Sequence, residues 1–342
     1  EEKEVETWKW IRKISLENYQ KTYNLLNSKF DSYNGESYYN DKMEPVVEEL
    51  RNKGLLKESE GAQVVDLSEY DMPPCIIITS AGTTIYATRD LASLKDRINK
   101  YNFDKAIYVV GNEQRLHFKQ VFKVLELMGY PEYAARCEHV PFGLVVDKTG
   151  EKIGSRKGNS VFLEDILKEA IQKVEKIIDE KNPKLENKED VARKVGVGAI
   201  IFNDLSNSRI KDEIFDWDML LNFQGETGPY IQYIYVRTRS LLEKAGYVPN
   251  LENINCGKLQ EKEAIETLKL LYNFNETVQV AAEKNEPSII ARYLINVAQS
   301  FSTFYNEHKI ITEDKAIQDA RLALTYAVGT VLETGVKLLG ME

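Results

Sequence analysis

The sequence predicts an α/β part followed by an all-α part, and three observations lead to this interpretation. Between about residues 74 and 146, apolar runs rich in β-branched residues alternate with helical patterns, an order typical of a parallel sheet with right-handed crossovers. After about residue 162, apolar residues recur every three or four positions, which predicts long helices. Gly228-Pro229 is a strong helix-opening signal, and three more long helical patterns follow it. The second part is therefore expected to be an antiparallel helical bundle.

The composition indicates a soluble globular chain of two or three domains. Of the 342 residues, 43% are hydrophobic and 29% are charged, and no run of about 18 apolar residues predicts a membrane span. The three cysteines and three histidines lack metal-ligand spacing, so no zinc site is expected. Scattered cysteines suit a reducing cytoplasm. The net charge of −9 argues against general nucleic-acid affinity, so any contact with RNA must use local patches.

The first 70 residues predict an insertion that packs against a sheet and carries few candidate functional groups. Residues 1–29 show a helical apolar pattern, residues 42–53 predict a second helix that ends at Gly54, and residues 62–67 predict a strand. The chain has no initiator Met and opens within a helical pattern. We therefore expect it to be part of a longer protein.

The following segment predicts the sheet itself. The expected order is a β-hairpin (74–79 and 83–87, with Gly82 in the turn), a helix (88–99), a strand (106–110), a helix (116–128) and a strand (139–146). Polar residues follow the expected strand ends near residues 87, 111 and 146. Because ligands bind at the carboxyl edge of an open parallel sheet, these three groups are expected to lie together along one edge.

The first two groups contain an acid, a phenol and an amide. Tyr86, Arg89 and Asp90 belong to the first group, and Gln114 and His117 follow Gly111 in the second. This combination suits a small cationic ligand, because a guanidinium matches a carboxylate with two parallel hydrogen bonds. Structural alternatives remain open: Tyr86 as a core residue and Asp90 as a favourable charge at a helix start. Gln114 could likewise be a surface helix start and His117 a satisfied buried imidazole.

The third group is a basic loop at residues 150–160. Lys152, Arg156 and Lys157 lie beside three glycines and two serines, between a predicted strand and a helix start with Ser160 as N-cap. A polyphosphate would neutralise the three cations, and the glycines let backbone N–H groups approach its oxygens. The alternative is a solvated basic hairpin tip.

The helical part contains one surface with a candidate function. Its predicted helices cover residues 162–182, 188–207, 258–284, 287–308 and 313–339, in addition to the helix that opens at Gly228. That helix combines aromatic and cationic side chains, Tyr230, Tyr233 and Tyr235 with Arg237 and Arg239. Aromatic rings can stack on unpaired bases while arginines hold the backbone, so the pattern suits RNA. The alternative is that the tyrosines belong to the bundle core.

Four of these segments resemble one known family. The K-I-G-S-R-K-G-N segment at 152–159 resembles the signature loop of class I aminoacyl-tRNA synthetases in its arginyl form. The segments Y-A-T-R-D (86–90), V-G-N-E-Q-R-L-H (110–117) and G-E-T-G-P-Y-I-Q-Y (225–233) resemble arginyl-tRNA synthetase motifs in the same order. The resemblance covers essentially the whole chain. It implies the second half of a Rossmann-like catalytic domain over 1–165, and a helical anticodon-binding domain over 166–342 whose family-like core starts near 225.

The resemblance also implies an activity and roles for the candidate residues. The activity would be ATP-dependent activation of arginine and its transfer to tRNA(Arg), in the cytoplasm, by a monomer that uses ATP as its Mg²⁺ complex. Contacts to arginine would come from Tyr86, Asp90 and Gln114. The ATP site would contain Gly111, His117, Lys152 and Lys157. The catalytic loop residues would be Lys152, Ser155, Arg156 and Lys157, whose cations stabilise charge on the pyrophosphate. The tRNA-binding residues would be Tyr230, Tyr233, Arg237 and Arg239.

The sequence departs from the family pattern in two places. Ile153 and Gly154 replace Met and Ser, and Ser155 stands where many class I enzymes have a second lysine. No H-x-G-H motif occurs in the 342 residues, and the family's N-terminal tRNA-binding domain is also missing. We therefore expect the chain to be inactive alone. Two alternatives remain: a truncated, non-catalytic tRNA-binding paralogue, and more distantly a cysteinyl-tRNA synthetase, which would require zinc-binding cysteines.

Overall fold

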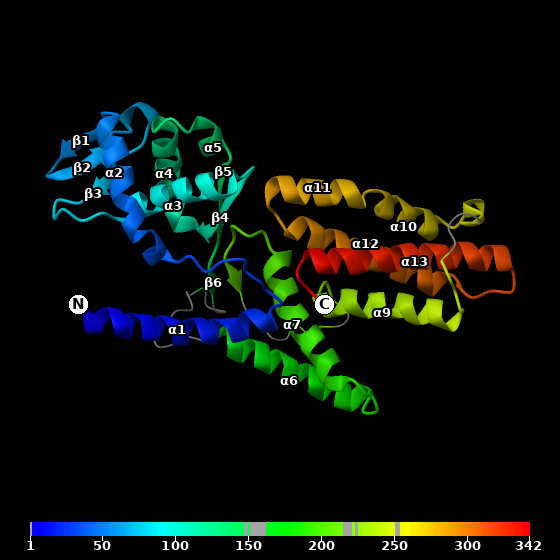
Figure 1. Ribbon diagram of the computed structural model, residues 1–342. Coiled ribbons are helices and arrows are strands. Elements are labelled where there is room, and N and C mark those ends of the chain that lie inside the picture. The colour runs from blue at the N-terminus through cyan, green and yellow to red at the C-terminus, as the bar shows by residue number, and fades with distance from the viewer. Residues whose placement is uncertain (1, 147–149, 151–161, 215–220, 223–224, 250–253) are drawn as a thin grey trace. The chain divides into compact units, whose positions relative to one another are not determined.

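The computed structural model describes residues 2–146, 150, 162–214, 221–222, 225–249 and 254–342 (Figure 1). The chain divides into two compact units. One contains Phe30–Leu144, and the other contains Glu1–Lys29 together with Val145–Glu342. Each unit has its own hydrophobic core.

The unit formed by Phe30–Leu144 combines short strands with helices. Its elements are η1 (Glu36–Lys42), α2 (Met43–Asn52), β1 (Leu56–Ser59), β2 (Ala62–Val65), η2 (Ser68–Tyr70), β3 (Cys75–Ile78), α3 (Tyr86–Tyr101), β4 (Ala106–Gly111), η3 (Asn112–Gln114), α4 (Arg115–Leu127), α5 (Pro131–Ala135) and β5 (Cys137–Phe142). Strands β1, β2 and β3 form an antiparallel sheet, and β4 pairs with β5 in parallel from Ala106–Cys137 to Gly111–Phe142. The predicted helices over 42–53 and 116–128 are thus confirmed as α2 and α4.

Helical periodicity explains how the helices of this unit reach its core. In α2 the apolar residues Val46, Val47 and Leu50 recur at helical spacing, and all three are buried. Leu91 of α3 and Val121 of α4 join the same core cluster. Burying an aliphatic side chain of this size stabilises the fold by about 1.5–3 kcal/mol, so this shared core holds the first turns of α3 and α4 in place.

One predicted strand is not present. Residues 83–87 do not form a hairpin arm, because only an isolated bridge joins Ile78 to Thr84 and Tyr86 already begins α3. The Thr88 hydroxyl donates a 2.6 Å hydrogen bond to the carbonyl of Ile77, which ties the first turn of α3 to the end of β3. The expectation that Tyr86 follows the end of a parallel strand is therefore wrong.

The second unit is almost entirely helical in its described residues. Its elements are α1 (Glu2–Leu25), β6 (Val145–Val146), α6 (Leu163–Lys181), α7 (Lys188–Ser206), β7 (Glu213–Ile214), α9 (Gly228–Lys244), η6 (Cys256–Lys258), α10 (Lys262–Tyr272), α11 (Phe274–Lys284), α12 (Ser288–Glu307) and α13 (Lys315–Leu338). Strands β6 and β7 pair in parallel. The predicted strand over 139–146 is observed as two pieces, β5 and β6. Apart from Gly150, the predicted basic loop at 150–160 lies outside the described residues.

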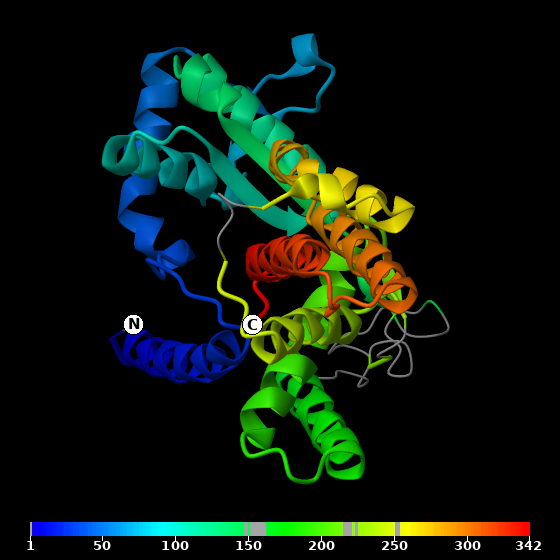
Figure 2. The same ribbon diagram turned by 90° about the vertical axis from the view of Figure 1, so that its right-hand side faces the viewer.

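The core of the second unit lies between α9, α12 and α13. Phe301 and Leu294 of α12 are fully buried with Ile231 of α9 and Leu332 of α13. Figures 1 and 2 show α12 and α13, orange and red, side by side along this core. The predicted helical bundle is thus confirmed.

Two predicted helix boundaries can be compared with the structure. The expected opening at Gly228-Pro229 is confirmed, with Thr227 as N-cap accepting a 3.3 Å hydrogen bond from the amide of Tyr230. The predicted single helix over 258–284 is instead two helices. At Asn273 the backbone amide bonds to the carbonyl of Leu270, a tighter turn that ends α10 before α11 begins.

Among the residues that the structure describes, no helix combines the length and the apolar character that crossing a bilayer requires.

Candidate active site

The first turn of α3 carries three of the polar groups that the sequence singled out. Tyr86 is 65% exposed, so the alternative that it is a core residue is wrong. The Arg89 guanidinium donates to the Glu36 carboxylate at 2.8 Å, and its central carbon lies 6.0 Å from the centre of the Tyr86 ring. Asp90 follows on the same turn. The start of α3 therefore presents an exposed aromatic ring beside two carboxylates, one of them on η1.

Glu36 is a candidate that the sequence reasoning missed. It lies 53 positions before Arg89 in a segment that was expected to carry few functional groups. Its only sequence signal is a tyrosine-rich run over residues 33–39. Nothing in this run indicates which distant helix the carboxylate will reach, because the contact depends on how η1 packs against α3.

Asp90 is joined directly to the second group of candidates. Its Oδ2 lies 2.6 Å from Nε2 of His117, on the first turn of α4. Both side chains are partly buried, with 32% of Asp90 and 22% of His117 exposed. An imidazole N–H that donates to a carboxylate at this distance forms a charge-assisted hydrogen bond. The structure thus brings two sequence candidates together from different helices.

A buried aromatic cluster supports His117 from below. Phe118 is buried, its ring meets that of His117 edge-on at 5.1 Å, and it stacks on His139 at 4.7 Å. Nε2 of His139 donates a 2.9 Å hydrogen bond to the carbonyl of Val110, at the end of β4. The imidazole of His117 therefore packs against the Phe118 ring, and its Nε2 lies next to the Asp90 carboxylate.

The same cluster contains a tyrosine with a shifted pKa. Burial raises the pKa of Tyr108 well above its ordinary value, against the opposing effect of the nearby Arg97. The Tyr108 hydroxyl accepts a 2.8 Å hydrogen bond from Nη1 of Arg97. Tyr108 is therefore a neutral structural hydroxyl at physiological pH.

The remaining candidates of the second group lie at the end of β4. Gly111 ends the strand, and a Cβ at this position would lie 2.9 Å from the Glu113 carboxylate. Gln114 is exposed at the end of η3, directly before α4 and three residues before His117. Among the sequence candidates, Tyr86, Asp90, Gln114 and His117 thus cluster at the starts of α3 and α4. The loop candidates Lys152, Ser155, Arg156 and Lys157 lie outside the described residues.

Among the tyrosine and arginine candidates of α9, the structure brings Tyr233 and Arg237 together. Tyr233 is 48% exposed, and the Arg237 guanidinium lies 4.6 Å from its ring centre and donates to its hydroxyl. Tyr230 is partly buried against the bundle core, and burial raises its pKa. Arg239 is exposed. The core alternative therefore applies in part to Tyr230 but not to Tyr233.

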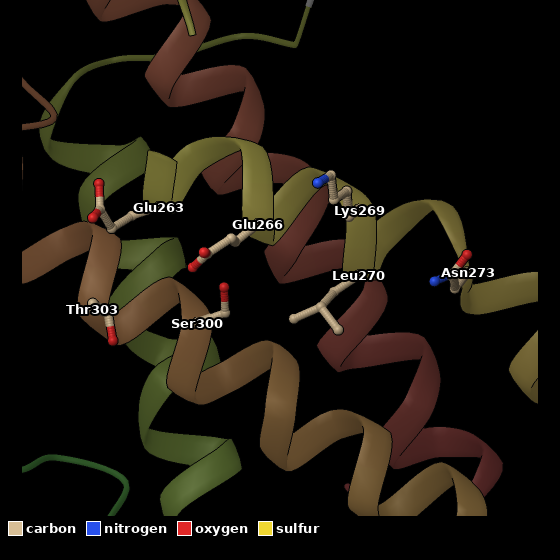
Figure 3. Close-up of a pocket in the computed structure, with 7 residues that line it drawn as sticks. All are labelled: Glu263, Glu266, Lys269, Leu270, Asn273, Ser300 and Thr303. Carbon is tan, nitrogen blue, oxygen red and sulfur yellow. The ribbon is translucent and has the colours of Figure 1, made fainter. Parts of the chain in front are cut away.

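An open pocket of about 390 Å³ lies between α10 and α12 (Figure 3). At one end, Glu263 accepts a hydrogen bond from His308 at 2.9 Å. The pocket is lined by Glu263, Glu266, Lys269, Leu270, Asn273, Ser300 and Thr303. The sequence reasoning singled out none of these residues.

Comparison with known families assigns each part of the chain. Residues 1–217 match the family described as tRNA synthetases class I (R), catalytic domain, and residues 231–342 match the DALR anticodon binding domain. The arginine–tRNA ligase of Halothermothrix orenii is 50% identical over 343 aligned positions, which cover all of this chain and 60% of that protein. The chain thus spans about 60% of the length of the curated relatives that it matches.

Two solved structures have a similar fold. The arginyl-tRNA synthetase of Thermus thermophilus superposes with a TM-score of 0.83 at 26% identity, covering 94% of this chain and 61% of that one. The arginyl-tRNA synthetase of Plasmodium falciparum superposes with a TM-score of 0.85, covering 98% of this chain and 57% of that one. At 24% identity, the second likeness concerns the fold alone.

Proposed function

This chain belongs to the class I arginyl-tRNA synthetase family, and from that membership we propose that the protein containing it is an arginine–tRNA ligase. The reaction has two steps. The arginine carboxylate attacks the α-phosphate of ATP, supplied as its Mg²⁺ complex, and gives arginyl-adenylate and pyrophosphate. The 3′-terminal hydroxyl of tRNA(Arg) then attacks the arginyl carbonyl and releases AMP.

The observation that carries this proposal is the surface at the start of α3. There the Glu36 carboxylate accepts a hydrogen bond from the Arg89 guanidinium, whose central carbon lies 6.0 Å from the centre of the Tyr86 ring. A substrate guanidinium would offer the same donors. Asp90 adds a second, partly buried carboxylate. A planar fork of donors matches such carboxylates better than an ammonium does, which favours arginine over lysine.

The other residue roles are part of the proposal. Tyr86, Asp90 and Gln114 contact the substrate arginine, and Gly111 contributes to the ATP site with Lys152 and Lys157. Lys152, Arg156 and Lys157 stabilise the charge that develops on the pyrophosphate, and Ser155 belongs to the same loop. For tRNA, the proposed contacts are Tyr230, Tyr233, Arg237 and Arg239. The sequence assigned His117 to the ATP site.

The proposed organisation follows the family. Residues 1–165 would be the second half of the catalytic domain and residues 166–342 would contain the anticodon-binding domain. We further propose a monomer that works in the cytoplasm. Because H-x-G-H does not occur in residues 1–342, we propose that this chain alone does not activate arginine.

Arginine-dependent exchange of pyrophosphate into ATP tests the activity. The full-length protein is assayed with and without tRNA(Arg), and citrulline and lysine replace arginine in the control reactions. Citrulline has nearly the shape of arginine but lacks its charge, so exchange with arginine alone is expected. Equal exchange with citrulline would contradict the proposal that carboxylates bind the charged guanidinium of arginine. Binding of tRNA(Arg) without exchange would instead support the non-catalytic paralogue.

A further inference from the structure

The contact between Asp90 and His117 connects the histidine to the proposed arginine site. The two residues are 27 positions apart and belong to α3 and α4, yet Nε2 of His117 and Oδ2 of Asp90 are 2.6 Å apart. A histidine that orients the Asp90 carboxylate depends on this bond.

The support on the other side of His117 explains why it can orient its partner. Its ring meets the buried ring of Phe118 edge-on, and Phe118 is itself stacked on His139, whose Nε2 is bonded to the β4 carbonyl of Val110. This packing restricts the imidazole to few orientations. Asp90, by contrast, lies on a helix turn with about a third of its side chain exposed. His117, whose ring is held by packing, therefore sets the orientation of the Asp90 carboxylate.

We propose that His117 is a positioning residue for the arginine site: it donates a hydrogen bond from Nε2 to Oδ2 of Asp90 and leaves Oδ1, together with the second lone pair of Oδ2, to accept from the substrate guanidinium. This inference rests on the proposed arginine–tRNA ligase function. A carboxylate that is already oriented loses less rotational freedom when the substrate binds, so the bond strengthens arginine binding without touching arginine. His117 then belongs to the amino-acid side of the site and not to the ATP side.

The choice of substitutions follows from the geometry. His117→Gln places an amide nitrogen near the position of Nε2 and retains the donor. His117→Asn places its amide near the position of Nδ1, too short to reach Asp90. His117→Phe keeps a ring against Phe118 but removes the donor. The glutamine variant is therefore the conservative replacement, and the other two remove the bond in different ways.

The experiment measures the Michaelis constants of the full-length protein for arginine and for ATP by pyrophosphate exchange. We expect His117→Phe and His117→Asn to raise the arginine constant about tenfold, as expected for the loss of one hydrogen bond to a charged group. His117→Gln should stay within about threefold of wild type, and the ATP constant should change less than about twofold in all three variants. Thermal unfolding of each variant identifies any that is misfolded. If the phenylalanine variant does not fold, the comparison of the glutamine and asparagine variants tests the inference.

A double-mutant cycle adds a second readout. In an Asp90→Asn background, His117→Phe should have little further effect on the arginine constant, because the oriented carboxylate is already lost. A rise in the ATP constant with a normal arginine constant would overturn the inference and restore the nucleotide role. Equal losses for glutamine and asparagine would also overturn it. A wild-type protein with no arginine-dependent exchange would overturn the proposed function itself, whereas an active wild type with unaffected variants would overturn only the role of His117.

Discussion

The guanidinium of Arg237 lies 4.6 Å from the ring centre of Tyr233 and donates a hydrogen bond to the hydroxyl of the same tyrosine. A second ring, that of Tyr305 on α12, lies 4.7 Å from the guanidinium. The cation is therefore held between aromatic rings of two helices. Such a cluster offers an exposed ring and a fixed positive charge, the combination that stacks on a base and neutralises a phosphate.

Tyr233→Ala should weaken binding of tRNA(Arg) with little effect on folding. Stacking of one base on an aromatic ring contributes about 1–3 kcal/mol, which corresponds to a loss of about five- to 150-fold in affinity. Tyr101→Ala removes a tyrosine that is 62% exposed on α3, in the other unit, and serves as the matched control. Equilibrium binding to labelled tRNA(Arg) measures both variants, and an unchanged affinity for Tyr233→Ala would place the ring outside the RNA contact.

The same binding should depend only moderately on salt. Because the described cluster offers few cations, the slope of log K against log salt concentration is expected to be about −2 to −4. Titrations at several salt concentrations give this slope. An unrelated RNA hairpin is the control, and equal affinity for it would contradict specific recognition.

Asp90→Ala should raise the arginine requirement of the full-length protein and leave the ATP requirement nearly unchanged. Removing one partner of a desolvated charge pair costs about 2–5 kcal/mol, so the Michaelis constant for arginine should rise about 30-fold to a few thousandfold. Asp96→Ala is the matched control, because Asp96 lies on the same helix and pairs with Lys100 at 2.8 Å. If Asp90 only favours the helix start, the variant loses about 0.3–1 kcal/mol of stability and keeps normal arginine kinetics.

Glu213 should make the stability of the helical unit depend on pH. Burial, together with a hydrogen bond and charge repulsion from Asp204, raises the pKa of Glu213 from 4.5 to about 7. Because the folded state binds this proton more tightly than the unfolded state, the stabilisation is fully present below about pH 4.5 and is lost as the pH rises through 7. The unfolding free energy should therefore fall by about 1 kcal/mol between pH 5 and 8, after allowance for solvent screening of this partly exposed group.

Urea unfolding of the 342-residue chain between pH 5 and 8 measures this effect. Glu213→Gln should flatten the profile and be more stable than wild type at pH 8. Glu283→Gln changes an exposed glutamate of α11 and should leave the profile as it is. If the unfolding free energy of the wild-type chain rose from pH 5 to pH 8, this would contradict a raised pKa of Glu213, because a raised carboxyl pKa makes that free energy fall.

Gly196→Ala should destabilise the packing of α7 against α6. The added Cβ would lie 2.9 Å from the backbone nitrogen of Ile171 and 3.0 Å from the carbonyl carbon of Ala170. Backbone atoms cannot rotate away, so the helices must separate, at a cost of about 1–3 kcal/mol. The better helix propensity of alanine offsets only about 1 kcal/mol of this loss.

Gly35→Ala is the control for that substitution. Gly35 has a φ of −74°, and nothing lies within 4 Å of a Cβ added there. Its unfolding midpoint should stay close to that of wild type. A Gly196→Ala chain as stable as wild type would mean that α6 and α7 adjust to the methyl group without loss.

Most helices could be predicted from the sequence because their signals are local. Apolar spacing located α2 and α4, and the Gly228-Pro229 pair located the start of α9. The misses also have local causes. The break at Asn273 interrupts no apolar pattern, so one long helix was expected where two occur. The run over 83–87 has the composition of a strand, but α3 already begins at Tyr86, and the Thr88 hydroxyl bonds its first turn to the end of β3.

By itself, the sequence determined the family, the helical part and the identity of the candidate groups Tyr86, Asp90, Gln114 and His117, since all of these reside in motifs and short-range spacing. Only the tertiary structure decided which groups meet. The bonds from Asp90 to His117 and from Arg89 to Glu36 join residues 27 and 53 positions apart. Spacing along a chain sets the face of a helix on which a side chain lies, whereas contacts between helices depend on how their buried faces pack, and that packing is a property of the whole core.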